Sequence, residues 1–384
     1  MNSREVVIVE AVRTPIGRGH REKGYYKDFH PAKLLATCYQ EILNRSGVEP
    51  LAVGDVISGC VMQYGEQSYN IARTGWLLAG LPYEVPATTV DRQCGSAQQA
   101  VNFGAALIAS GVNDVVIGAG VEHMGHNPLT NPFEGPGVAW IEEIREHYDV
   151  QVQSVGAELI ADQWSVTRED MDEIGAMSQQ RAAQATAEGR FDREVVPITV
   201  NGETYTTDQG IRPDTSREGL AALRPAFSED GRITAGNASQ ISDGAAAVLL
   251  MSREKAEELG LRPRARIVDQ VAVGVDPRTM LTGPIPATQK LLARNGMAID
   301  DIDLHEVNEA FASVIVAWQR ELGADLDRTN VNGGAIALGH PVGATGARLV
   351  TTLLHELERS DKELGMVTMC CGGGLGTGTI IQRV

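Results

Sequence analysis

Residues 88–111 read TTVDRQCGSAQQAVNFGAALIASG, and this stretch indicates how the rest of the chain is built. The β-branched residues Thr88 to Val90 predict a strand, and the alanine-rich run that ends at Gly111 predicts an amphipathic helix. Cys94 stands between them, where its sulfur would face unpaired backbone N–H groups and the positive end of the helix dipole. Both features favour the thiolate. Cys94 is therefore a candidate nucleophile, and a small buried apolar side chain explains this stretch equally well.

The composition narrows the class of protein. The chain has 384 residues, enough for two or three domains with substantial cores, and its 43% hydrophobic and 22% charged residues are ordinary for a globular protein. The formal net charge of −17 argues against binding to nucleic acid or to an anionic membrane. An anionic small ligand needs only a local basic cluster and stays compatible with this charge.

Five cysteines are scattered along the chain without the spacing of a disulfide framework or a zinc site, namely Cys38, Cys60, Cys94, Cys370 and Cys371. We expect free thiols, no metal and a cytoplasmic location. The first apolar run is too short for a signal peptide and contains acidic residues, and no run approaches the length of a membrane span. The sequence therefore predicts a protein that does not enter the membrane.

Predicted strands and helices alternate over both ends of the chain. Strands are expected at residues 6–9, 55–60, 88–90 and 114–118, with helices at 31–46 and 70–79 between them. After residue 236 the alternation resumes with strands at 244–251, 265–273 and 303–307 and helices at 252–259, 286–295 and 309–322. This pattern predicts an α/β protein with a largely parallel sheet.

The middle of the chain differs from both ends, and the end of the chain repeats the beginning. Residues 120–236 contain a segment rich in Asn, Pro and Gly at 127–137, then helical periodicity and short strands, which predicts an inserted domain. Residues 329–373 repeat the order of strand, loop, long helix and glycine-rich strand end seen in 88–120. We infer two similar halves. Cys94 and the loop at 332–346 would then occupy equivalent strand ends that face each other.

Two further residues complete a chemical set with Cys94. His340 lies in the glycine-rich segment GGAIALGHPVGATG, with Pro341 suited to the first position of the next helix, and glycines there favour close approach of a ligand. Cys370 ends an apolar strand, and the glycines after it expose backbone N–H groups suited to an oxyanion hole. Strand alternation sends the neighbouring Cys371 the opposite way. Two thiols and an imidazole can combine acyl transfer with proton transfer next to a thioester.

The blocks DRQCGSAQQA, TAGNASQISDGAAAVLLMS, GPIPATQK, VNEAFA, NGGAIALGHPVGATGAR and MCCGGGLG resemble the signature blocks of the thiolase family, the acyl-CoA acetyltransferases, in order and over essentially the whole chain. The resemblance implies a duplicated βαβαβαββ core in five layers, αβαβα, with a loop domain inserted in the first half. We accordingly divide the chain into the start of the N-terminal half at 1–119, a CoA-binding loop domain at 120–238, the completion of that half at 239–262 and the C-terminal half at 263–384.

The same resemblance implies roles for individual residues. Cys94 would be the acylated nucleophile, His340 would activate it and Cys370 would be the acid/base. Asn308 would hold a water that, together with His340, forms an oxyanion hole for the thioester enolate. The backbone N–H groups of Cys94 and Gly372 would form the second hole, around the oxygen of the attacked carbon. Taken without the resemblance, Asn308 reads as a helix N-cap.

Substrate contacts are also implied by the resemblance. Ser239 would contact the pantetheine arm, Arg212 would lie by the adenine end of coenzyme A, and Gln153, Met280 and Phe311 would bind substrate. Ser239 otherwise reads as a turn residue and Arg212 as one exposed charge. Family members that act on acetoacetyl-CoA place a methionine where Gln153 stands, so the sequence favours a degradative 3-ketoacyl-CoA thiolase, including those that act on steroid side chains. The alternative is a biosynthetic thiolase that condenses two acetyl-CoA molecules.

Coenzyme A would be a co-substrate, and no permanently bound cofactor is expected. By family precedent the protein would be a homodimer or homotetramer. Decarboxylating ketoacyl synthases share the fold, but they generally pair the cysteine with two histidines or with a histidine and an asparagine, and they lack an equivalent of Cys370. A noncatalytic acyl-CoA carrier is disfavoured by the intact set of Cys94, His340, Cys370 and Asn308. A dehydrogenase is disfavoured because GAGVEHMG lacks the G-x-G-x-x-G spacing. Cys371 leaves open which of the two adjacent thiols titrates.

Overall fold

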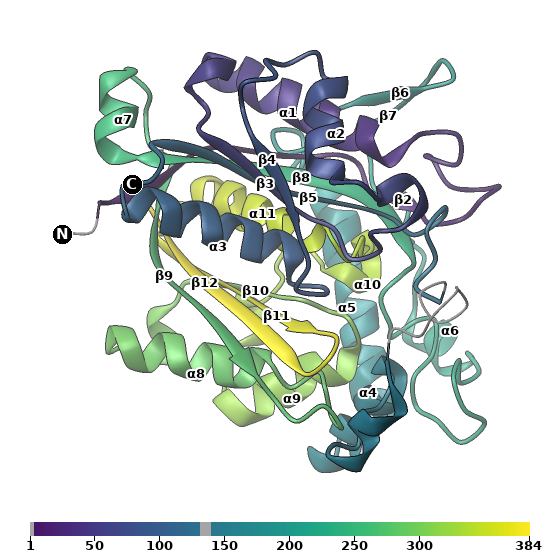
Figure 1. Cartoon of the computed structure of the whole chain (residues 1–384). Helices are drawn as coiled ribbons and strands as arrows, with labels where there is room; N and C mark the ends of the chain where they lie inside the picture. The colour runs from purple at the N-terminus through teal and green to yellow at the C-terminus, as the bar shows by residue number, and fades with distance from the viewer. Residues whose placement is uncertain (1–3, 131–139) are drawn as a thin grey trace.

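The computed structural model describes residues 4–130 and 140–384 and arranges them in five layers (Figure 1). Helices α1 and α2 cover one side of a sheet, α3 and α11 lie in the middle, and α8 and α9 cover the far side of a second sheet region. The first half consists of β1 (Val6–Arg13), β2 (Gly17–Arg18), α1 (Pro31–Ser46), β3 (Asp55–Gly59), α2 (Ile71–Leu78), β4 (Ala87–Val90), α3 (Ser96–Ala109), β5 (Val115–His123) and β8 (Ser242–Ser252).

The second half repeats this order after the short helix α7 (Arg253–Glu258). Its elements are β9 (Ala265–Gly274), α8 (Pro284–Asn295), β10 (Leu304–Val307), α9 (Ala312–Leu322), α10 (Ala335–Leu338), α11 (Thr345–Arg359), β11 (Leu364–Cys371) and β12 (Leu375–Arg383). The segment between β5 and β8 contains α4 (Gln153–Gln163), α5 (Arg168–Ala187), β6 (Ile198–Val200), β7 (Glu203–Tyr205) and α6 (Arg217–Ala221). The Asn-, Pro- and Gly-rich segment predicted at 127–137 lies partly outside the described residues.

The strands of the two halves join edge to edge in the order β10-β11-β12-β9-β1-β8-β5-β3-β4. The prediction of a largely parallel sheet is wrong. Only β10–β11, β5–β3 and β3–β4 are parallel neighbours along this order, because β8 and β12 return antiparallel in each half and β9 meets β1 antiparallel between the halves.

Local sequence signals explain several element ends. Pro31 starts α1 at a position that needs no N–H donor, and Gly47 ends it with φ of 69°, which a side chain would strain. Asn70 caps α2 by accepting a hydrogen bond from the backbone of Arg73. The predicted boundaries of both helices therefore agree with the structure to within one residue.

Three local predictions in the second half are wrong. Helix α9 begins at Ala312 rather than at Glu309, because Phe311 is extended and pairs with residue 238 through an isolated bridge. Pro341 does not start a helix, since α11 begins four residues later at Thr345. The strand expected near residue 330 is reduced to a single bridge between Thr329 and His305.

The two central helices approach closely where α11 begins. A Cβ added to Gly346 would lie 2.2 Å from the backbone nitrogen of Gln98 in α3, so only glycine fits at this crossing. The Gln98 side chain, itself buried, donates to the Val367 carbonyl and to Thr379 and accepts from Thr377. Helix α3 of the first half is thereby bonded to the sheet of the second half, which fixes the helix that follows Cys94 relative to β11.

Candidate active site

Cys94 lies in a tight turn between β4 and α3. Gln93, just before it, has φ of 50°, a strained value for a residue with a side chain. The turn is stabilised by the Asp91 carboxylate, which accepts from the Gln93 N–H at 2.6 Å. Ser96 adds to it by donating to the Gln93 carbonyl at 2.6 Å and accepting from the Arg92 N–H at 2.8 Å. The strain and its supports fix where the sulfur points.

The backbone N–H groups of Cys94 itself and of Gly372, in the turn after β11, lie close enough to the Cys94 sulfur to lower its pKa. Burial nevertheless raises the pKa of Cys94 to about 11, and the carboxylates of Glu122 and Asp91 oppose the thiolate further. The backbone N–H groups favour the thiolate, as expected from the helix end, but burial outweighs them. A nucleophilic role for Cys94 would therefore need a base.

His340 lies buried in the loop between α10 and α11. Gly339 before it has φ of 111°, and a Cβ there would stand 2.5 Å from the Ser242 hydroxyl oxygen. The His340 N–H donates to that same hydroxyl at 3.0 Å and to the Gln240 carbonyl at 3.3 Å. The loop is thus held against the start of β8, and glycine is required for the approach.

Neighbouring groups determine the tautomer of His340. Its Nδ1 lies 2.7 Å from the hydroxyl oxygen of Thr345, and that hydroxyl donates its proton to the Pro341 carbonyl at 2.9 Å. Nδ1 is therefore the protonated nitrogen, and Nε2 accepts from the Asn308 amide at 3.3 Å. Burial and the nearby Arg348 guanidinium lower the pKa of His340 to about 3. The ring is neutral, with Nε2 available to take a proton.

Asn308 joins His340 to the second thiol. Its side chain donates to Cys370, and its Oδ1 is buried without a hydrogen bond to the protein. Burial raises the pKa of Cys370 well above its usual value, and the neighbouring thiols Cys94 and Cys371 act in the same direction. Both sulfurs and the imidazole are thus brought together, and Asn308, which does not cap α9, connects them.

Cys371 points to the opposite side of β11 from Cys370, and its sulfur lies close to Cys94. It packs with the central helices, whereas Cys370 belongs to the apolar cluster of α4, α9 and the second half. The Cys371 sulfur contacts the Thr377 side chain and the Gly95 N–H, and burial raises its pKa far above normal. The predicted alternation of the two thiols is confirmed. Cys370 is the thiol that shares Asn308 with the imidazole.

The predicted substrate contacts lie at different places. Ser239 bonds through its N–H to the Ala310 carbonyl at 2.9 Å, beside the Phe311 segment. Met280, buried with φ of 54°, lies in the same apolar cluster as Cys370. Gln153 begins α4, and its Nε2 would lie 3.5 Å from a Cβ added to Gly372. Gln153 therefore borders the turn after Cys370, and Met280 shares the apolar cluster of Cys370.

Arg212 and Phe311 lie further out. Arg212 is exposed in the inserted segment, and its guanidinium makes no hydrogen bond or ion pair within residues 4–130 and 140–384, although its N–H donates to Gln179 at 2.7 Å. The Phe311 ring packs edge-on against the exposed Phe227 at 6.2 Å between centroids. The structure therefore brings Phe311 close to Ser239 but leaves Arg212 at the surface.

Sequence reasoning missed three residues of this region. Gln93 places its Oε1 3.0 Å from a Cβ added to Gly372, so it flanks the same turn as Gln153. Thr345 fixes the tautomer of His340, and Glu122 lies buried near Cys94. Their positions immediately before Cys94 and five residues after His340 were usable signals for the first two. Glu122, near the end of an apolar strand, was a signal for the third.

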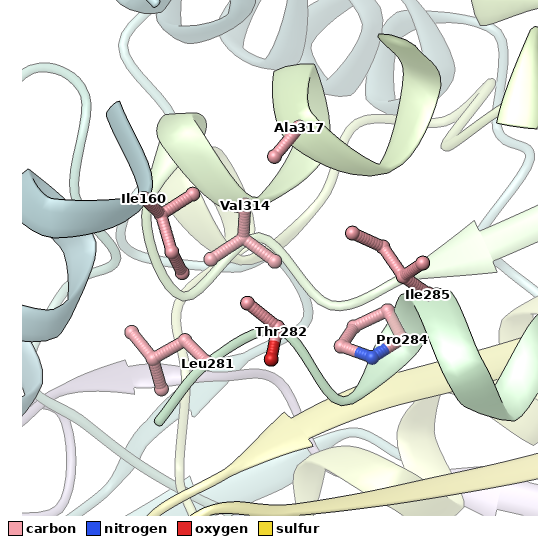
Figure 2. Close-up of a pocket in the computed structure, with 7 residues that line it drawn as sticks. All are labelled: Ile160, Leu281, Thr282, Pro284, Ile285, Val314 and Ala317. Carbon is pink, nitrogen blue, oxygen red and sulfur yellow. The ribbon is translucent and has the colours of Figure 1, made fainter. Parts of the chain in front are cut away.

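A small apolar hollow lies elsewhere in the molecule. Figure 2 shows its side chains, which come from α4, α8, α9 and the segment before α8: Ile160, Leu281, Thr282, Pro284, Ile285, Val314 and Ala317. None of them is a reactive group, so this hollow reflects the packing of α4 onto the second half. Over the residues that the structure describes, no cluster of His, Cys, Asp and Glu could hold a metal ion, and no helix has the length and apolarity to cross a membrane.

Known proteins that resemble this chain were compared with it over its whole length. The chain fits the thiolase N-terminal domain over residues 6–254 and the thiolase C-terminal domain over residues 261–383. It belongs to the thiolase family. It is 46% identical to the steroid 3-ketoacyl-CoA thiolase FadA6 of Mycobacterium tuberculosis, covering 99% of this chain and 94% of that protein. It is 43% identical to a 3-ketoacyl-CoA thiolase of Bacillus subtilis, covering 99% of each.

A solved structure confirms the fold class. The crystal structure of the Bacillus anthracis acetyl-CoA acetyltransferase superposes with a TM-score of 0.91 at 40% identity, covering 100% of both chains. The predicted thiolase fold is therefore confirmed, whereas the domain boundaries at 119, 238 and 262 remain a prediction.

Proposed function

We propose that this protein cleaves 3-ketoacyl-CoA with coenzyme A, giving acetyl-CoA and a shortened acyl-CoA through an acyl-Cys94 intermediate. In the first half-reaction His340 Nε2 takes the Cys94 proton as the sulfur attacks the keto carbon. The bond between the keto carbon and the α carbon breaks, and its electrons form the acetyl-CoA enolate. The α carbon then takes a proton from Cys370, and acetyl-CoA leaves.

In the second half-reaction coenzyme A enters as a co-substrate. The Cys370 thiolate takes the proton of the CoA thiol, and the CoA sulfur attacks the acyl-Cys94 carbonyl. Cys94 leaves as a thiolate and recovers its proton from His340, so every group returns to its starting state. His340 and an Asn308-bound water would stabilise the enolate oxygen. The N–H groups of Cys94 and Gly372 would stabilise the oxygen of the attacked carbon.

One observation carries this proposal. The N–H groups of Cys94 and Gly372 converge on the Cys94 sulfur, so an acyl oxygen on that sulfur would lie within their reach. The neutral Nε2 of His340 supports the base, and the bond from Asn308 to Cys370 supports the proton donor on the same side. Ser239 would contact the pantetheine arm and Arg212 the adenine end of coenzyme A, while Gln153, Met280 and Phe311 would face the acyl group.

Two observations bear on the size of the acyl group. Similarity to FadA6, a steroid 3-ketoacyl-CoA thiolase, and the amide of Gln153 beside Gly372 favour a degradative reaction on groups larger than acetoacetyl. The second candidate is condensation of two acetyl-CoA molecules. It is favoured by 42% identity over 100% of both chains to the acetyl-CoA acetyltransferase of Syntrophomonas wolfei. Comparing thiolysis kcat/KM for short, long, α-methyl and steroidal 3-ketoacyl-CoA separates the two. Acetoacetyl-CoA as by far the best substrate would favour condensation.

Mass spectrometry tests the intermediate directly. Incubation with a 3-ketoacyl-CoA in the absence of coenzyme A should add the acyl mass to the peptide that contains Cys94. Cys94→Ala should remove the adduct, and the matched control Cys38→Ala, in buried α1, should keep it. Absence of the adduct in the unaltered protein, or its persistence in Cys94→Ala, would overturn the proposal.

We also infer a homodimer or homotetramer in a reducing cytoplasm. Strand β4 is the edge of the sheet and leads directly to Cys94, and Tyr69 and Tyr83 on the neighbouring segments are 96% and 73% exposed. An unpaired edge beside exposed aromatic rings suits a subunit contact. The five free thiols suit a reducing compartment. Light scattering at micromolar concentration would test the assembly, with a monomer mass as the contrary result.

A further inference from the structure

Glu122, near the end of β5, is a completely buried carboxylate that the proposed mechanism does not use. It accepts hydrogen bonds from the N–H groups of Val61 at 2.9 Å and Met62 at 3.2 Å, and from the Gln67 amide at 2.6 Å. The Gly343 N–H is a further donor, and the Cys60 thiol lies 3.9 Å away. In the described part of the chain no lysine or arginine pairs with it, so amide groups supply most of the compensation for its burial.

These donors come from both halves of the molecule. Residues 60–62 follow β3 of the first half, and Gly343 follows His340 in the second half. The contact is tight: a Cβ on Gly343 would lie 2.4 Å from the Val121 carbonyl oxygen and 2.6 Å from a Glu122 carboxylate oxygen. Glu122, on β5, therefore connects the His340 loop of the second half to the segment after β3 of the first half.

The same donors shape the surroundings of Cys94. Val61, Met124 and Val342 form a small apolar cluster against which Met62 and Cys94 pack. Glu122 fixes the backbone at Val61 by accepting its N–H. By accepting the Gly343 N–H it also fixes the backbone next to Val342. Burial raises the pKa of Glu122 to about 7, and the negative charge it carries above that pH opposes the thiolate of Cys94. Its contribution must therefore be geometric, because its charge acts against the nucleophile.

We infer that Glu122 is a positioning residue for thiolysis, whose carboxylate aligns the His340 loop with Cys94 by accepting the Gly343 and residue 61–62 N–H groups together. The inference rests on the role proposed for His340. Replacement by glutamine keeps the shape but turns one acceptor oxygen into a donor, which would face an N–H group. Replacement by aspartate keeps the charge but shortens the reach.

The test uses acetoacetyl-CoA and coenzyme A with the full chain. Glu122→Gln should lower kcat about 30-fold, with KM changed less than threefold, because a small misplacement of a catalytic group costs rate rather than binding. Glu122→Asp should also lose about tenfold, since charge alone does not align the loop. Cys60→Ala, which removes only the weakest contact of the same carboxylate, should stay within about twofold of the unaltered protein.

A second measurement separates alignment from general damage. Removing the charge favours the Cys94 thiolate, so iodoacetamide should alkylate Cys94 in folded Glu122→Gln as fast as in the unaltered protein or faster. Slower turnover together with undiminished alkylation supports the inference. A kcat within threefold of the unaltered value, or alkylation and kcat that fall together with the folded fraction, would overturn it. His340→Ala measured alongside distinguishes the two proposals, because an active His340→Ala would overturn the role of His340 itself.

Discussion

The junctions that precede α3 and α11 occupy equivalent places in the two halves, yet they present opposite chemistry. The first follows a true edge strand, β4, and places a half-buried thiol one residue before the helix cap. The second has lost its strand to a single bridge at Thr329, and its loop buries His340 five residues before α11. The duplication thus supplies one position open to substrate and one shielded position whose hydrogen bonds are fixed.

The shared consequence of burial is that both groups are uncharged. The pKa of Cys94 is raised to about 11 and that of His340 is lowered to about 3. A stable thiolate–imidazolium pair would require the opposite shifts. The two junctions therefore form a neutral thiol–imidazole pair in the free protein, and the proton moves only when substrate is attacked.

Of the substitutions that test this comparison, replacing the His340 imidazole should lower activity most. We expect His340→Asn to lower kcat for thiolysis by about 10³, because a general base contributes that order of rate and Cys94 is not ionised on its own. Stopped-flow absorbance of the acetoacetyl-CoA enolate measures it. Turnover within tenfold of the unaltered protein would mean that the second junction does not supply the base.

The two adjacent thiols at the end of β11 should differ strongly in how much their removal lowers kcat. Cys370→Ala should lower kcat by about 10² or more, because Cys370 shares Asn308 with His340. Cys371→Ala is the matched control and should stay within about threefold, because its sulfur faces the central helices. Exchange of the α protons of acetyl-CoA in D₂O, followed by NMR, reports the acid/base directly. Exchange lost in Cys371→Ala but kept in Cys370→Ala would reverse the assignment.

Much of the fold was predictable because its signals are local. Gly47 and Asn70 mark the ends of α1 and α2 through a positive φ and a side-chain cap, both visible as residue types. The alternation that sends Cys370 and Cys371 to opposite faces follows from strand geometry alone. The duplicated order of elements around Cys94 and His340 was also predictable, because each copy has the same local sequence signals.

The remaining features depend on contacts between distant segments. The antiparallel return of β8 and β12 is decided by how each half closes its sheet, and an apolar run does not record strand direction. The helix end that favours the Cys94 thiolate is visible in the sequence, whereas the burial that raises the pKa of Cys94 is not. Glu122 gathers donors from residues 61, 62, 67 and 343, and no local pattern reveals that.

Removing the fixed tautomer should have a smaller effect than removing the imidazole. We expect Thr345→Val to lower kcat about tenfold to a hundredfold, because Nδ1 loses its acceptor and part of the population moves its proton to Nε2. Thr351→Val in the same helix loses an equivalent hydroxyl bond, to the Ala347 carbonyl, without touching His340, and should retain most activity. Equal losses in both variants would point to damage to α11 rather than to the tautomer.

The smallest expected effect is the pH dependence of Cys94 alkylation, whose rate should change by about tenfold per pH unit. It tests whether the two junctions are neutral in the free protein. A thiol whose pKa is raised to about 11 gains thiolate in proportion to hydroxide at every lower pH, so the logarithm of the iodoacetamide rate should rise with a slope near one above pH 8. Between pH 6 and pH 8 the slope should be lower, because burial raises the pKa of Glu122 to about 7 and its ionisation opposes the Cys94 thiolate. His340, with its pKa lowered to about 3, adds no titration in that window. Peptide mass spectrometry isolates Cys94 from the buried Cys38 and Cys60, which should react only on unfolding.

His340→Asn should leave the slope unchanged, because the imidazole is neutral throughout. A rate that is flat below pH 8 and falls in His340→Asn would instead reveal a thiolate–imidazolium pair, and the two junctions would then be charged rather than neutral.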